Sequence, residues 1–206
     1  MFFTDKIQGT IGQLGLQDWW LSTFTEEEQK YIIQTYQPLG VGDNIVGDSL
    51  IKGDGDCNPN AVSILSDLAT WFKKEIDHTI GFRIIAKAEE SINSSTNILD
   101  IHFLYNNKIS LYYRFRDSEP NALEEAISAC KKQIEISAKA KVQFKKEYKK
   151  SPLPSHTGFE QLAIIEEKRG NFKSCIDIST TALKEGWSGD WENRIERVKR
   201  KIDKLK

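Results

Sequence analysis

Apolar side chains recur at steps of three and four residues along most of the chain after residue 60. Such spacing places them on one face of an α-helix, with polar residues on the other face. The pattern predicts amphipathic helices at 61–76, 80–92, 120–134, 138–149, 158–168, 173–187 and 190–206. The fold class expected from this pattern is all-α.

The segment 98–116 fits two kinds of secondary structure. In a helix, apolar residues such as Ile101 and Tyr105 share one face. In two strands, apolar residues alternate on either side of Asn106-Asn107, a pair suited to a hairpin turn. Local propensity favours strands because the segment is rich in Ile, Phe and Tyr. The helical neighbours favour a helix, since an isolated two-stranded hairpin is only marginally stable. We expect the helix, with the β-hairpin as the alternative.

The first 60 residues have a different character. Thr25 and Glu28 fit a capping box that begins a helix reaching about Tyr36. Residues 39–60 hold five glycines and four aspartates, which indicates a long loop. We therefore expect a lead-in helix and an acidic loop in 1–60, followed by a helical domain in 61–206. Three aromatic residues that precede the helix are expected to pack onto the first hairpin: Trp19, Trp20 and Phe24.

Residues 158–187 resemble a tetratricopeptide repeat. The first helix carries Phe159, Leu162 and Ala163, the turn reads Gly170-Asn171-Phe172, and the second helix has small residues at Cys175 and Ala182. Glu166 and Trp187 depart from the family pattern, where an aromatic residue and a proline are usual. A similar spacing recurs from Leu65 to Ala88 and, less clearly, around Ala126. The resemblance therefore covers about residues 61–187.

The resemblance implies a short TPR-like right-handed α-α superhelix of about three helical hairpins. One hairpin cannot bury its apolar face alone, but stacked hairpins bury it between neighbours. Helix 190–206 then caps the stack, and Trp187 and Trp191 are expected to fill the seam between the last two helices. In such stacks the first helix of each hairpin lines a concave groove. The residues implied there are Ser63, Ser66, Thr70, Lys73 and Lys74 in the first hairpin, and Thr157, Glu160, Ile164, Glu167 and Lys168 in the last.

The function expected from this architecture is a non-enzymatic scaffold or adaptor that binds a protein or peptide in its concave groove. Two alternatives come from charge. The chain is nearly neutral, with 29 basic and 30 acidic side chains, but residues 1–60 carry a net charge of −6 and the remainder +5. Pairing of the acidic front with a neighbour's basic rear would make the protein a subunit of a larger assembly by self-association. The basic stretches 139–150 and 194–206 suggest nucleic-acid binding instead.

The sequence holds no recognisable catalytic or cofactor motif. Its three histidines are far apart: His78 is expected at the surface, His102 in the core, and His156 in the turn before a helix. The segment 54–60 imitates a calcium loop, but Pro59 and Leu65 occupy the positions of the turn glycine and the bidentate glutamate. No catalytic residue, cofactor or metal site is therefore expected.

The three cysteines are scattered and form no CxxC pair, which is typical of a reduced compartment. The first residues lack the basic segment and apolar core of a secretory signal. No apolar run approaches the roughly 18 residues needed to cross a bilayer. We therefore expect a cytoplasmic protein without a membrane segment.

Overall fold

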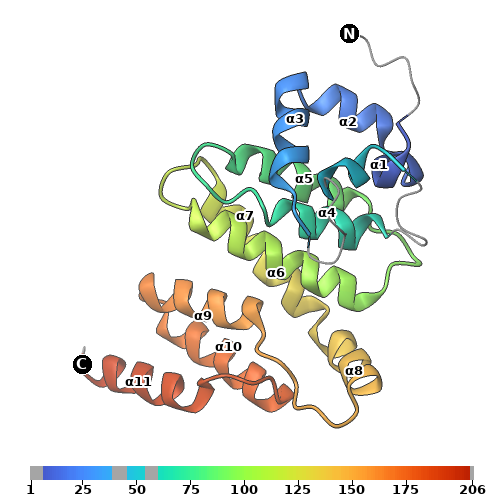
Figure 1. The fold of residues 1–206 in the computed structure, drawn as a ribbon. Helices are drawn as coiled ribbons and strands as arrows, with labels where there is room; N and C mark the ends of the chain where they lie inside the picture. Colours follow the sequence, from blue (N-terminus) through green and yellow to red (C-terminus); the bar gives the residue numbers. More distant parts are fainter. Residues whose placement is uncertain (1–6, 39–45, 54–59, 205–206) are drawn as a thin grey trace. The chain divides into compact units, whose positions relative to one another are not determined.

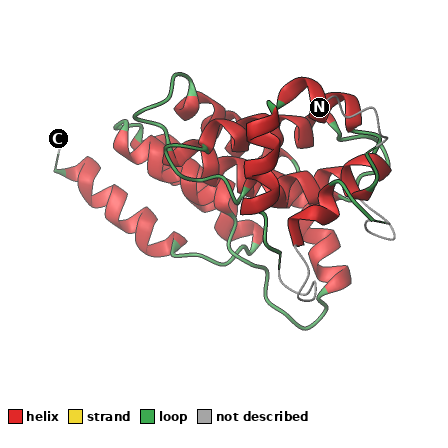
Figure 2. Cartoon of the chain, turned by 45° about the horizontal axis from the view of Figure 1, so that its top comes forward, coloured by secondary structure: helices red, strands yellow, loops and turns green. Residues whose placement is uncertain are grey.

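The computed structural model describes residues 7–38, 46–53 and 60–204. Figure 2 shows that this part of the chain consists of helices joined by loops. Its β-type pairing is confined to an isolated parallel bridge between Ser155 and Ser188. The predicted all-α fold class is therefore confirmed.

The chain divides into two compact units, Met1–Ile92 (unit 1) and Asn93–Lys206 (unit 2). The two units meet after residue 92, at the end of the first predicted hairpin. The domain border expected at residue 60 therefore lies inside unit 1. The TPR-like superhelix of stacked hairpins would span both units, and it remains a prediction.

Unit 1 is built from short helices (Figure 1). Helices α4 and α5 pack against each other as the first predicted hairpin, and α1 and α3 both contact η1. The side chain of Asn60 caps α4 by accepting a hydrogen bond from the Val62 N–H at 3.0 Å. The elements are α1 (Gly9–Gln13), α2 (Gln17–Thr23), α3 (Glu26–Thr35), the 3₁₀ helix η1 (Val46–Leu50), α4 (Ala61–Ala69) and α5 (His78–Glu90).

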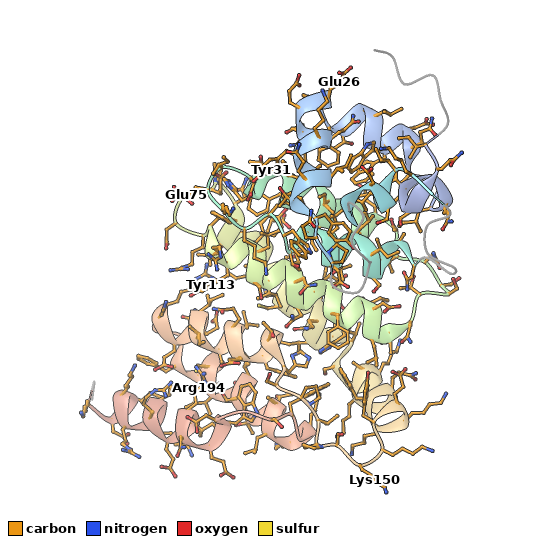
Figure 3. All side chains as sticks on the ribbon, viewed as in Figure 1. Glu26, Tyr31, Glu75, Tyr113, Lys150 and Arg194 are labelled. Atoms are coloured by element: carbon orange, nitrogen blue, oxygen red, sulfur yellow. The ribbon has the colours of Figure 1, made fainter. Side chains whose placement is uncertain are left out.

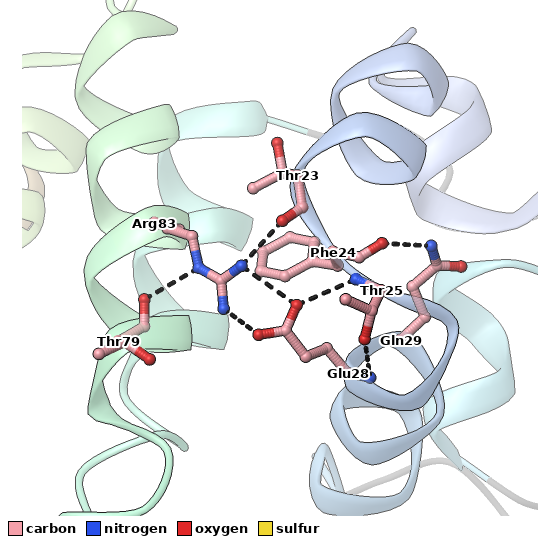
Figure 4. Close-up of polar contacts among 7 residues, drawn as sticks. All are labelled: Thr23, Phe24, Thr25, Glu28, Gln29, Thr79 and Arg83. Carbon is pink, nitrogen blue, oxygen red and sulfur yellow. Dashed lines mark hydrogen bonds and ion pairs between the residues drawn. The ribbon is translucent and has the colours of Figure 1, made fainter.

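Arg83 of α5 holds the junction between α2 and α3 (Figure 4). Its guanidinium donates to the Thr23 carbonyl at 2.8 Å and forms a bidentate ion pair with Glu28. Glu28 also accepts from the Thr25 N–H at 3.0 Å, while the Thr25 hydroxyl accepts from the Glu28 N–H at 3.2 Å. This is the predicted capping box, which is confirmed. The hydrogen bond from Arg83 lowers the pKa of Glu28.

Two of the three aromatic residues before α3 lie in the core of unit 1, and the third is half-buried. Trp20 and Phe24 are buried, with ring centroids 5.3 Å apart, and Trp19 packs edge-on against Phe24 at 5.4 Å. The Arg83 guanidinium lies 4.8 Å from the centre of the Phe24 ring. The predicted core role of Trp20 and Phe24 is confirmed.

Helix α4 ends earlier than the periodicity predicts, at Ala69 instead of Ile76. The Thr70 hydroxyl donates back to the Asp67 carbonyl at 2.8 Å, and the buried Asp77 carboxylate accepts from the Lys74 N–H at 2.8 Å. Such bonds from side chains to the backbone stabilise a turn in place of further helix. The spacing of apolar residues in 61–76 also predicts that Ile76 lies on the buried face, and this prediction is wrong, because the exposed fraction of Ile76 is 81%.

Unit 2 contains longer helices (Figure 1). The segment 98–116 forms a helix, α6, so the β-hairpin alternative is wrong. Asn97 caps α6 by accepting from the Leu99 N–H at 3.0 Å, and one face is buried through Tyr105 and Ile109. The elements are α6 (Ile98–Arg114), α7 (Ala122–Glu135), α8 (Ser137–Glu147), α9 (Thr157–Lys168), α10 (Phe172–Glu185) and α11 (Trp191–Asp203).

Helices α9 and α10 form the hairpin predicted from the tetratricopeptide resemblance. Gly170 has φ +78° in the turn, a conformation that glycine adopts without steric cost. The small residues Cys175 and Ala182 are fully buried, as is Ala163 on the opposite helix. Helix α11 then packs on α10 through the buried Val198. The hairpin and the helix after it are thus confirmed as local structure.

Gly158 allows α7 and α9 to approach closely. A Cβ atom at this position would lie 2.8 Å from the Gln133 side-chain oxygen and 2.9 Å from the Cys130 carbonyl. Gln133 is fully buried and links two elements: it donates to the His102 carbonyl at 2.9 Å and accepts from the Gly158 N–H at 2.6 Å. It therefore satisfies one of the backbone N–H groups at the start of α9 that lack a partner within the helix.

We expect Gly158→Ala to destabilise unit 2 by about 1 kcal/mol, the difference between two effects. An extra methyl group in a packed core usually costs about 2 kcal/mol. The intrinsic helix preference of alanine, about 1 kcal/mol, acts in the opposite direction. Urea unfolding followed by circular dichroism measures the net effect. Glu160→Ala on the exposed side of α9 serves as the control and should change stability by less than about 0.5 kcal/mol. A Gly158→Ala variant as stable as the wild type would contradict the close approach.

Candidate functional site

The groove residues expected in the first hairpin do not form a helical face. Ser66 lies in α4 with an exposed fraction of 2%, so it is not available to a partner. Thr70 caps the end of α4, and its hydroxyl is bonded to Asp67. Lys73 and Lys74 lie in the turn after α4, because this helix ends at Ala69. The predicted helical position of Lys73 and Lys74 is therefore wrong, whereas Ser63 and Ser66 lie in α4 as expected.

The groove residues expected in the last hairpin do lie on one helix, α9. Glu160 is exposed and Ile164 is half-buried. The Lys168 ammonium donates to the Tyr113 hydroxyl at 3.3 Å, near the end of α6 (Figure 3). Glu167 faces α11 instead of open solvent, and its side chain is only 11% exposed.

Glu167 is the centre of an ion cluster with three cations of α11. Its carboxylate lies 2.8 Å from Arg197, 2.6 Å from Lys201 and 3.8 Å from Arg194. Figure 3 shows Arg194 between α11 and the α9–α10 hairpin. The hydrogen bond from Arg197, with that from Lys201, lowers the pKa of Glu167 to about 2. This carboxylate therefore ties α11 to α9 and is already engaged within unit 2.

Two histidines meet in the core of unit 2. The rings of His102 and His156 are 5.0 Å apart, and Trp187 stacks on His102 at 5.7 Å with an interplanar angle of 10°. His156 caps α9, since its Nδ1 accepts from the Phe159 N–H at 3.3 Å. Both imidazoles are almost completely buried, and burial lowers the pKa of His102 to about 4 and that of His156 to about 3. The predicted roles of His102 in packing and of His156 in the turn before α9 are confirmed.

His78 differs from its prediction. It lies at the start of α5 and is buried, with its ring 5.3 Å from that of Phe82 and its Nδ1 2.9 Å from the Glu75 carbonyl. The expected surface position is wrong because the ring packs against Phe82 and is bonded to the backbone of the turn before α5. In the residues that the structure describes, no group of three or more His, Cys, Asp or Glu side chains is arranged to hold a metal ion. The calcium-like segment 54–59 lies outside the described residues.

The two basic stretches differ in how their charges are used. On α11, Arg194, Arg197 and Lys201 pair with Glu167, and Arg200 pairs with Glu196 at 3.1 Å. In the described part of unit 2, none of the six lysines of 139–150 forms an ion pair. The positive charge of 139–150 is therefore uncompensated, whereas much of that on α11 is neutralised locally.

A hollow lies between α6, α8 and the chain that follows α8. Its volume is about 230 Å³. Phe103 and Tyr148 line it although they are 47% and 53% exposed, and Phe144 forms its buried side. We call it the α8 hollow, and its full lining is Phe103, Phe144, Tyr148, Ser151, Pro152, Leu153 and Pro154.

Sequence reasoning missed this hollow. The pattern in 138–149 predicts that Tyr148 faces the core with Ala140 and Phe144, but α8 ends at Glu147 and Tyr148 is exposed. This prediction is wrong because the chain turns at Tyr148 and leaves the helical path. The one available signal was the segment 151–154, where two prolines flank Leu153 and interrupt the helical pattern.

Comparisons of the chain with protein families, with curated proteins and with solved structures found no match. In the described residues, no helix combines the length and apolar character that a membrane span requires. A proposal for function therefore depends on the chemistry of the surfaces themselves.

Proposed function

We propose that this chain is a non-enzymatic protein-binding module that holds an apolar side chain of its partner in the α8 hollow. The observation that carries the proposal is the exposure of Phe103 and Tyr148 at the rim of an otherwise apolar depression. Exposed aromatic groups that gather around a depression are characteristic of protein interfaces, where they form the contacts with the largest energies.

The size and lining of the hollow support a side chain as its occupant. Its volume of about 230 Å³ is below the roughly 300–1,000 Å³ of pockets for small molecules. Its polar groups are those of Ser151 and the Tyr148 hydroxyl, and it has no carboxylate, imidazole or thiol for general acid–base or nucleophilic chemistry. This composition favours binding over catalysis.

The proposal keeps the binding function expected from the tetratricopeptide resemblance but places it on a different surface. In the first hairpin, Ser66 is buried and both lysines lie in a turn. In the last hairpin, Glu167 is held by α11. Thr157 is bonded to Asn106 and Lys168 to Tyr113. The groove residues that remain are Ser63 in unit 1 and Glu160 and Ile164 in unit 2, which are too few to define a recognition surface. The α8 hollow combines exposure with a shaped apolar lining in one unit.

Two other hollows fit a partner less well. One, of about 670 Å³, lies at the α9–α10 turn and is lined by charged and polar residues such as Glu166, Lys173 and Asp177. Another, of about 260 Å³, lies in unit 1 beside Glu28 and Tyr31. These two side chains are already bonded to Arg83 and Asp77, respectively. Neither hollow presents two exposed aromatic rings.

The test is capture of a partner from a lysate of the native host, followed by purification of that partner and calorimetric titration with the full chain. We expect Phe103→Ser with Tyr148→Ser to weaken binding by about 1,000-fold, because aromatic anchors in an interface each contribute about 2 kcal/mol or more. Lys173→Glu with Lys184→Glu, on the exposed side of α10, is the control and should leave affinity unchanged. Equal affinity of the aromatic double variant and the wild type would overturn the proposal.

A further inference from the structure

The lysines around the α8 hollow are arranged alongside its apolar lining. Lys141 and Lys145 precede Phe144 and Tyr148 by three residues each. Tyr148 is the C-cap of α8, and its N–H still bonds to the Phe144 carbonyl at 2.8 Å. Residues three apart are neighbours on a helix surface, so the two lysines lie beside two residues of the hollow's lining. Figure 3 shows Lys150 projecting from the turn that follows α8. One side of the hollow is thus bordered by positive charge.

This charge has no counterpart within the described part of unit 2. Residues 139–150 hold six lysines and one glutamate, a net charge of +5. Glu147 is bonded to Gln143 at 2.6 Å and not to any of the lysines. On α11, by comparison, Glu167 alone collects three cations. A cluster of like charges without internal partners raises the free energy of the isolated surface, which an oppositely charged partner relieves.

From this juxtaposition we infer that the partner segment is an acidic peptide with one large apolar side chain. This inference rests on the proposed function of the α8 hollow. The apolar side chain occupies the hollow against Phe103, Phe144 and Tyr148. The acidic residues on one side of it lie against Lys141 and Lys145. The apolar contact supplies most of the affinity, while the charges set orientation, association rate and discrimination against basic or neutral segments.

A single-stranded nucleic acid is the competing occupant, since bases stack on exposed aromatic rings beside basic residues. Two observations favour the peptide. All six basic residues of 139–150 are lysines, whereas arginine is the residue that binds phosphate in a bidentate manner. The rings of Phe103 and Tyr148 border a hollow with proline walls, which fits a branched or aromatic side chain better than a row of stacked bases.

The experiment is fluorescence anisotropy with the full chain and four labelled probes at low salt. The first is a short acidic peptide with a central phenylalanine, the second has serine in place of phenylalanine, and the third has amides in place of the acids. The fourth is an oligothymidine of similar length. We expect the first peptide to bind at least about tenfold more tightly than each of the others. Lys141→Gln with Lys145→Gln should weaken it about tenfold, an effect that fades as salt screens the charges.

The outcomes separate the inference from the proposed function. The α10 variant Lys173→Gln with Lys184→Gln removes the same charge elsewhere and should bind the first peptide normally. If the neutral phenylalanine peptide binds as tightly as the acidic one, the inference is wrong and the apolar hollow remains the binding site. Equal binding of the serine peptide, with displacement by oligothymidine, would identify a general polyanion surface and overturn both proposals. If no probe binds, the inference is overturned, and the captured partner decides the proposed function independently.

Discussion

Replacement of Trp187 by alanine is expected to destabilise unit 2 by about 4 kcal/mol, within the range for aromatic-to-alanine changes in a core. Trp187 is 2% exposed and lies in one cluster with Phe144, Phe159 and Trp191. Its ring is 4.6 Å from that of His156 and 5.9 Å from that of Phe144. The residue therefore joins the end of α10 to α8 and to the start of α9, and its removal leaves a cavity that these helices share.

Denaturant unfolding followed by circular dichroism measures this change. Trp187→Phe is the matched variant: it loses the indole hydrogen bond to Glu185, which is 2.7 Å long, but retains most of the apolar contact. It should cost less than half as much as the alanine variant. A loss below about 1 kcal/mol for Trp187→Ala would show that the cluster closes around the missing ring or contributes little.

The cluster also supports the α8 hollow, because Phe144 packs against Trp187 on one side and lines the hollow on the other. Trp187→Ala is therefore a poor reagent for testing partner binding, since it disturbs the fold and the site together. The exposed residues Phe103 and Tyr148 are better suited, because each has about half of its surface in solvent.

Mild acid is expected to destabilise unit 2 by about 4 kcal/mol between about pH 7 and about pH 5. In the unfolded chain both histidines have a pKa near 6.5. Burial lowers the pKa of His102 to about 4 and of His156 to about 3. As the pH falls below 6.5, the unfolded chain gains two protons that the folded chain does not bind. Each histidine thus costs about 2 kcal/mol by pH 5, and stability continues to fall until the folded-state pKa values are passed.

The cause lies in the surroundings of the two rings. The Nδ1 of His102 and the Nε2 of His156 are buried and have no hydrogen-bond partner in the described part of the chain. A positive charge on either ring would therefore be neither solvated nor paired. The neighbouring His102 lowers the pKa of His156 further, since two adjacent imidazolium groups repel each other.

The measurement is denaturant unfolding at several pH values for the wild type and a double variant, His102→Gln with His156→Asn. The asparagine keeps an acceptor at the N-cap of α9 and does not titrate. The variant should be less stable at neutral pH but should lose far less stability on acidification. Glu167 does not interfere, because its stabilising contribution is lost only as the pH falls from its ordinary pKa of 4.5 towards its folded-state pKa of about 2. The same loss in variant and wild type would show that other groups carry the acid sensitivity.

Several features of this protein follow from short stretches of its sequence alone. The reciprocal bonds of Thr25 and Glu28, the cap at Asn60 and the glycine turn at Gly170 depend on residues within a few positions of each other. The helical period likewise predicts α9, α10 and α11, and the helical neighbours correctly favour a helix at α6. Hydrogen bonds at helix ends, backbone preferences and the 3.6-residue period act over one or two turns, so a local pattern is enough to predict them.

Only the tertiary structure decided where α4 ends, which charges are neutralised and where the α8 hollow lies. Asp77 fixes the turn after α4 while it also accepts from Tyr31, 46 residues earlier. Glu167 collects cations from about 30 positions later, and His102 meets His156 and Trp187 from separate helices. Phe103 and Tyr148 become the rim of a hollow only when α6 and α8 pack together. Such contacts depend on how distant helices are placed against each other, and the period of a single helix carries no information about that placement.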